Sequence, residues 1–226
     1  MVRIYGKDTV TVNGSKVIIR QVLFHGSKEV TRAVTDIVSS ARAWIRMTLP
    51  ELRSKPDPKV GALFGECFAN PPDTAAAMNT VRSSLSTIGN FLGRELGIKV
   101  REDDDAHGYV KQYYGNRVHL VGGVIQYEDD GRTIARQGEV HIAKDTVLEN
   151  PVLATITLIH EAGHKFVNFQ DFDDQGYFKD DLSGYSAPGL TWQQALRNAD
   201  SHAVFTYKVM ESKFKTVMVH GRGLAT

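Results

Sequence analysis

A short run in the second half of the chain, His160-Glu161-Ala162-Gly163-His164, places two histidines four residues apart within an apolar stretch. On an α-helix, residues i and i+4 lie on one face, so the two imidazoles project the same way and can hold one metal ion. Glu161 follows the first histidine by one residue, about 100° around the helix. The sequence therefore predicts a helix that carries a zinc site, with a carboxylate beside the open position of the metal.

The carboxylate of Glu161 has a chemical role in such a site. A carboxylate at this position can take a proton from zinc-bound water and later return it to a leaving amine. The motif thus predicts one zinc ion per chain, held by His160 and His164, with Glu161 as general base and then acid. The alternative is a helix face on which the two histidines only pack or form hydrogen bonds.

A catalytic zinc ion needs a third protein ligand and keeps its fourth position for water. The stretch after His164 contains no further histidine, and the next glutamate is Glu211. The nearby oxygen donors are three aspartates that follow the expected end of the helix near Phe169, namely Asp171, Asp173 and Asp174. A short turn would bring one of them back to the metal. The alternative is an acidic, solvated loop.

The run Asp174-Gln175-Gly176-Tyr177 follows the zinc motif closely. In this combination the sequence resembles the aspzincin metallopeptidases, which include deuterolysin and the peptidyl-Lys metalloendopeptidases. The resemblance implies that Asp174 is the third ligand and that the phenol of Tyr177 stabilises the transition state. Two features of the family, a Gly-Thr pair before the aspartate and a glycine after the tyrosine, are absent here, so Asp173 stays an alternative ligand.

A second run, Asn198-Ala199-Asp200-Ser201, also resembles the aspzincins. In the lysine-specific members this segment lines the pocket for the residue after the cleaved bond, and the resemblance assigns Asp200 to that pocket. Ala203 stands where a second acidic residue is expected, and a single carboxylate would bind lysine less firmly. The alternatives for Asp200 are a carboxylate on a helix face and a hydrogen-bond partner of a zinc-binding histidine.

The remaining elements indicate an α+β fold with a zincin-like metallopeptidase domain. Two β-branched runs around Asn13-Gly14 predict a β-hairpin over 9–24, which is expected as an N-terminal extension covering 1–26 before a main domain of 27–226. Apolar residues at helical spacing predict helices over 28–47 and 73–96. Asn150 and Pro151 mark the start of the zinc helix, and Thr191 to Gln194 fit a capping box that opens a last helix extending to about residue 214.

Short β-prone runs between residues 97 and 148 predict a small mixed sheet. The alternating run Glu139–Ala143 lies shortly before the zinc helix. In zinc peptidases of this general shape the strand nearest the metal lies at a sheet edge, where a peptide can bind as an added strand. His141 is then either a residue at the rim of the site or an ordinary exposed histidine, and the alternation favours the second.

Composition and charge exclude several classes of function. The 226 residues carry 27 basic against 26 acidic side chains, which gives no electrostatic case for nucleic acid or an anionic membrane as partner. No run has the length of a membrane span, and the first residues lack the apolar run of a signal peptide. The single cysteine, Cys67, excludes an intramolecular disulfide. These features favour a bacterial protein that is cytoplasmic or delivered by a specialised secretion system.

The sequence therefore predicts a zinc-dependent endopeptidase that acts on a protein or peptide substrate, as a bacterial effector or toxin would. Two alternatives stay open. One is a non-catalytic protein that keeps the zinc-binding fold to bind a partner, and the other is a zinc amidase that acts on cell-wall peptides.

Overall fold

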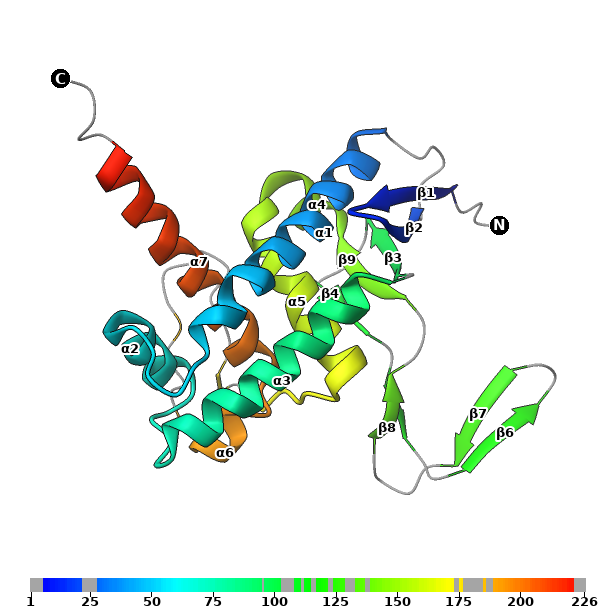
Figure 1. Cartoon of the computed structure of the whole chain (residues 1–226). Coiled ribbons are helices and arrows are strands. Elements are labelled where there is room, and N and C mark those ends of the chain that lie inside the picture. The colour runs from blue at the N-terminus through cyan, green and yellow to red at the C-terminus, as the bar shows by residue number, and fades with distance from the viewer. Residues whose placement is uncertain are drawn as a thin grey trace.

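The computed structural model describes most of the chain, including both expected zinc-binding histidines. The described residues are 6–21, 28–94, 96–102, 108–110, 112–114, 117–121, 124–128, 133–136, 139–172, 175–176, 185 and 189–221. The fold is α+β and mainly helical, with a small mixed sheet at one side (Figure 1). Within the described residues, no helix combines the length and the apolar character that crossing a bilayer requires.

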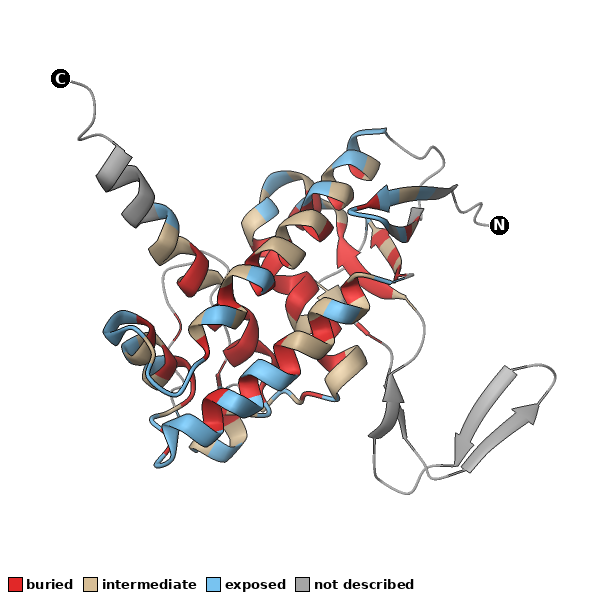
Figure 2. Cartoon of the chain, in the orientation of Figure 1, coloured by how far each residue is buried: buried red, intermediate tan, exposed pale blue. Residues whose placement is uncertain are grey.

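Seven α-helices form most of the described structure. Their bounds are α1 (Lys28–Thr48), α2 (Pro58–Cys67), α3 (Thr74–Leu92), α4 (Lys144–Glu149), α5 (Pro151–Val167), α6 (Trp192–Ala195) and α7 (Ala199–Gly221), and a 3₁₀ turn (Leu49–Glu51) follows α1. Helix α5 packs against α1, α3 and α7 and against the sheet, and it is buried on nearly all sides (Figure 2). The helix expected to bear the zinc site therefore lies at the centre of the core.

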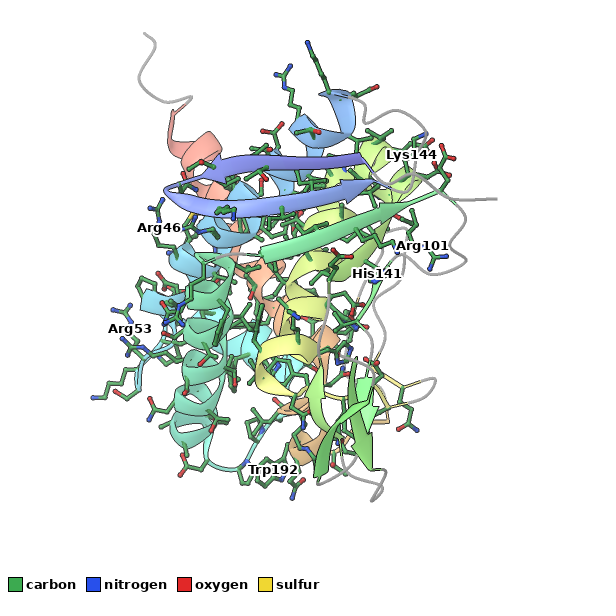
Figure 3. All side chains as sticks on the ribbon, turned by 90° about the vertical axis from the view of Figure 1, so that its right-hand side faces the viewer. Arg46, Arg53, Arg101, His141, Lys144 and Trp192 are labelled. Carbon is green, nitrogen blue, oxygen red and sulfur yellow. The ribbon has the colours of Figure 1, made fainter. Side chains whose placement is uncertain are left out.

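Five strands form the main sheet, in the order β1 (Gly6–Val12), β2 (Ser15–Gln21), β3 (Leu96–Arg101), β9 (Val140–Ala143) and β4 (Gly108–Tyr109). Strands β2, β3 and β9 run parallel, whereas β1 and β4 are antiparallel to their neighbours. The first three strands lie side by side in front of the helices in Figure 3. Asn13 and Gly14 turn the β1–β2 hairpin with φ of 48° and 80°, which confirms the predicted turn.

The hairpin expected as an N-terminal extension shares the main sheet, because β2 pairs with β3 from Leu96 to Val100. Two further pairs lie apart from this sheet. Strand β5 (Gln112–Tyr114) pairs with β8 (Thr133–Arg136), and β6 (Arg117–Val121) pairs with β7 (Val124–Glu128).

Strand β9 is an interior strand rather than the expected edge. Strand β3 pairs with one side of it and β4 with the other, so β4 forms the edge of the sheet at this end. All four residues of β9 are buried, including His141 at 6% exposure, and Figure 3 shows this residue in the sheet. The interpretation of His141 as an exposed or rim residue is therefore wrong, because alternation exposes every second side chain only where nothing covers that face.

The predicted zinc helix begins as the sequence indicates. Asn150 caps α5 by accepting a hydrogen bond from the Leu153 amide at 3.0 Å, and Pro151 occupies the first helical position. The predicted last helix is two helices instead. Thr191 and Gln194 form the capping box, but they open only the short α6, and α7 begins at Ala199. The helix is interrupted between α6 and α7 because the backbone of Gln170 forms hydrogen bonds with that of Arg197 and Ala199.

Candidate metal centre

Three side chains converge at the C-terminal end of α5. The Nε2 atoms of His160 and His164 lie 2.8 Å apart, as expected for helix positions i and i+4. Asp171, four residues beyond the helix, places its Oδ1 3.1 Å from His164 Nε2 and 3.5 Å from His160 Nε2. Among the described residues, these three offer ligand atoms that all lie within 4.8 Å of one another.

The spacing of these atoms fits one zinc ion. Tetrahedral zinc with bonds of about 2.0–2.1 Å separates its ligand atoms by about 3.3 Å. The three separations of 2.8, 3.1 and 3.5 Å lie on either side of that value. Two imidazole nitrogens and one carboxylate oxygen are also a donor set that zinc accepts in catalytic sites. The residues present therefore fit the metal that the motif predicts.

The second nitrogen of each imidazole has an acceptor of its own. His160 Nδ1 lies 2.7 Å from Asp200 Oδ1, and His164 Nδ1 lies 2.8 Å from the carbonyl oxygen of Phe169. Each Nδ1 therefore donates its proton, which leaves the lone pairs of both Nε2 atoms directed at the same point. Two lone pairs at 2.8 Å repel each other unless a cation lies between them.

The charges around His160 also favour a cation. Burial alone would lower the pKa of this imidazole, but the carboxylate of Asp200 beside it, aided by Glu161 and Asp171, outweighs burial and raises the pKa to about 10. A divalent cation at the same point would face the same three carboxylates.

The cluster is buried on one side and open on the other. The side chains of His164 and Glu161 are 3% and 5% exposed, whereas that of Asp171 is 35% exposed. Glu161 Oε1 lies 3.8 Å from His160 Nε2, next to the point at which the lone pairs meet. The arrangement thus has a carboxylate at its floor and access from solvent at its rim, as a catalytic metal site requires.

The chain between α5 and Asp171 is held by its backbone. Asn168 ends the helix in the left-handed region, with φ of 59°, and its amide donates to the Gly163 carbonyl. The carbonyl of the next residue, Phe169, then accepts from His164 Nδ1. Gln170 donates to the Arg197 carbonyl at 2.8 Å and accepts from the Ala199 amide at 3.2 Å. These contacts deliver Asp171 to the two imidazoles.

The structure brings together four of the residues that the sequence singles out: His160, Glu161, His164 and Asp200. Of the three aspartates considered as third ligand, Asp171 joins the cluster. Asp173, Asp174 and Tyr177 lie outside the described residues, so their assignments stay predictions.

One alternative for Asp200 is a hydrogen-bond partner of a zinc-binding histidine. The structure shows this contact, because Asp200 accepts from His160 Nδ1. Asp200 is buried, with 10% of its side chain exposed, and lies at the start of α7. The role of Asp200 in a pocket for substrate stays a prediction.

Two groups close to the cluster, the Phe169 carbonyl and the His202 ring, are not among the residues that the sequence singles out. The Phe169 carbonyl is a backbone group, and no residue type signals it, although Asn168 is a typical residue for the turn that aims it. His202 is wholly buried, and its ring lies 4.0 Å, centroid to centroid, from that of Phe169. Its sequence signal is its position two residues after Asp200, directly after the run that resembles the aspzincins.

His202 makes the stability of the metal-free chain depend on pH. Burial lowers the pKa of His202 to about 4, from about 6.5 in the unfolded chain. Between these values only the unfolded chain takes up the proton, so the contribution of His202 to stability falls as pH drops from 6.5 to 4 and is constant below that range. We expect a loss of about 3 kcal/mol over this window. Urea unfolding of the wild type and His202→Phe in chelator measures it, and equal pH slopes in both would contradict the assignment.

Comparison with known proteins identifies no relative from which a function could be assigned to this site. No protein-family model matches the chain, and no curated protein matches its sequence.

Proposed function

We propose that the protein is a zinc-dependent endopeptidase with a zincin-like domain. The observation that carries the proposal is the convergence of His160 Nε2, His164 Nε2 and Asp171 Oδ1 on one point, with Glu161 beside it. A purely structural zinc site closes around its metal with four protein ligands, whereas this cluster has three among the described residues and a solvent-exposed side. The proposal also has the support of the resemblance to aspzincins.

Each residue of the cluster has a defined task in peptide hydrolysis. His160, His164 and Asp171 would hold the zinc ion, which when bound activates water and polarises the carbonyl to be attacked. Glu161 takes the proton from the attacking water and delivers it to the nitrogen of the leaving amine. Asp200 and the Phe169 carbonyl hold the two imidazoles in the tautomer that presents Nε2 to the metal.

The edge strand β4 supplies a place for an extended peptide. A Cβ at Gly108 would lie 2.5 Å from Thr157 Cγ2 and 3.2 Å from Glu161 Cγ, so the backbone of β4 lies directly against the helix beside the general base. A peptide that pairs with an exposed strand edge is bound through its main chain. A substrate held along β4 would therefore present its peptide bonds beside Glu161.

Hydrolysis of an unstructured protein tests the proposal. The purified chain with one equivalent of zinc is expected to cleave casein, to lose this activity in a chelator, and to regain it when zinc is restored. His160→Ala and His164→Ala should lose both zinc and activity. Stoichiometric zinc without cleavage of casein would favour the non-catalytic binding protein, and peptide release from murein with intact casein would favour the cell-wall amidase.

Asp200→Asn should separate the two roles considered for Asp200. If the carboxylate orients His160, its neutral replacement weakens zinc affinity about 10- to 100-fold, the usual effect of a partner behind a metal ligand. If Asp200 lines the substrate pocket instead, zinc affinity stays unchanged and KM rises for substrates with lysine after the cleaved bond. Competition with a zinc chelator measures the first quantity, and a pair of peptides with lysine or leucine at that position measures the second.

A further inference from the structure

We infer that His202 is a positioning residue for the metal centre, acting through Phe169 on the zinc ligand His164. The inference rests on the proposed function and names a residue on which that site depends. Neither ring nitrogen of His202 bonds a ligand atom, because Nδ1 donates to the Asn198 carbonyl and Nε2 has no hydrogen-bond partner among the described residues. Its effect instead passes through one aromatic ring and one backbone carbonyl.

The ring of His202 is fixed within α7. It is wholly buried, and its Nδ1 donates to the Asn198 carbonyl at 3.1 Å. The ring of Phe68 meets it edge to face at 5.1 Å, and the ring of Phe169 lies against it at 4.0 Å with an angle of 31° between the planes. His202 thus forms a rigid surface against which Phe169 packs.

Phe169 is also confined by the zinc helix. A Cβ at Gly163 would lie 2.5 Å from Phe169 Cδ2, so the phenyl ring lies directly on the helix backbone, one residue before His164. The Phe169 amide donates to the Gly163 carbonyl at 3.3 Å. With its ring between Gly163 and His202, Phe169 has little freedom to move its carbonyl, and this carbonyl accepts the hydrogen bond from His164 Nδ1.

The contribution of His202 comes from its ring rather than from its free nitrogen. His202 Nε2 is buried and has no hydrogen-bond partner among the described residues. An unpaired polar atom in the core lowers stability. A phenylalanine at this position keeps the flat surface against Phe169 and removes that unpaired atom, so it should support the metal site as well as histidine does.

The start of α7 and the residues just before it also contact His160 and the backbone next to Asp171. Asp200 accepts from His160 Nδ1, and the backbone of Arg197 and Ala199 pairs with Gln170, next to Asp171. Residues 197–202 therefore set the position of all three ligands relative to one another. His202 is the member of this segment that acts on His164.

Zinc affinity and the visible absorption of the Co²⁺-substituted protein test the inference. We expect His202→Ala to weaken zinc binding about 10- to 100-fold and to alter the Co²⁺ spectrum, because Phe169 can then shift and release His164. His202→Phe should restore affinity to within about threefold of the wild type. Gly163→Ala places a methyl group against the same ring and should weaken binding similarly, although alanine favours the helix.

Phe205→Leu is the matched control. Phe205 is equally buried on α7 but packs against Phe64 and Phe68, so its replacement should lower thermal stability without changing zinc affinity or the Co²⁺ spectrum. Wild-type zinc affinity in both His202→Ala and Gly163→Ala would overturn the inference. Should His202→Ala fail to fold, Gly163→Ala decides. Absence of zinc binding by the wild type would instead contradict the proposed function itself.

Discussion

Replacing Glu161 with glutamine is expected to lower peptide hydrolysis by about two to four orders of magnitude while zinc stays bound. Glutamine keeps the shape of the side chain, but its amide cannot accept the proton of the attacking water. Glu161 Oε1 lies 3.8 Å from His160 Nε2 and outside the group of three ligands, so the metal keeps its protein donors. The effect should therefore fall on kcat, with little change in zinc content.

Elemental analysis and casein turnover, measured on the same preparation of Glu161→Gln, give the answer. Glu149→Gln is a matched control, because it makes the same chemical change at an exposed position at the end of α4 and should leave both quantities unchanged. Near-normal turnover in Glu161→Gln would show that this carboxylate is not the base. Loss of zinc would show that it contributes to binding the metal.

The helical part of the fold is the part that sequence periodicity could predict. Helices α1, α3 and α5 follow apolar patterns and caps that are local, and the Asn13-Gly14 turn is determined by two residues. The break between α6 and α7 could not be predicted from the segment itself, because it depends on pairing with Gln170. The parallel order of β2, β3 and β9 likewise depends on contacts between strands far apart in the chain.

At the candidate site, too, local sequence determines some positions, whereas others depend on contacts between segments far apart in the chain. The spacing of His160, Glu161 and His164 on one helix determines their relative positions, and the structure brings their side chains together as the helical geometry predicts. Asp171 lies beyond the helix end, and its position depends on the left-handed turn at Asn168 and on the backbone pairing of Gln170. Neither feature follows from the spacing of the three aspartates.

The structure and the family resemblance indicate different aspartates as the candidate third ligand. Asp171 Oδ1 lies 3.1 and 3.5 Å from the two imidazole nitrogens, and the residue before it is paired with α7. The resemblance favours Asp174 instead, with Asp173 as an alternative. All three are carboxylates close together in the chain, so composition and charge do not separate them.

We expect Asp171→Asn to weaken zinc affinity by more than about a hundredfold, beyond the range of groups that only support a ligand. A neutral amide replaces the anionic oxygen, which is a poorer donor to zinc. Asp173→Asn and Asp174→Asn make the same change nearby and should stay within about tenfold of the wild type. Competition titrations of the three variants against a zinc chelator decide the matter. If Asp174→Asn loses the metal and Asp171→Asn keeps it, the ligand follows the aspzincin pattern, and Tyr177 gains support as the transition-state phenol.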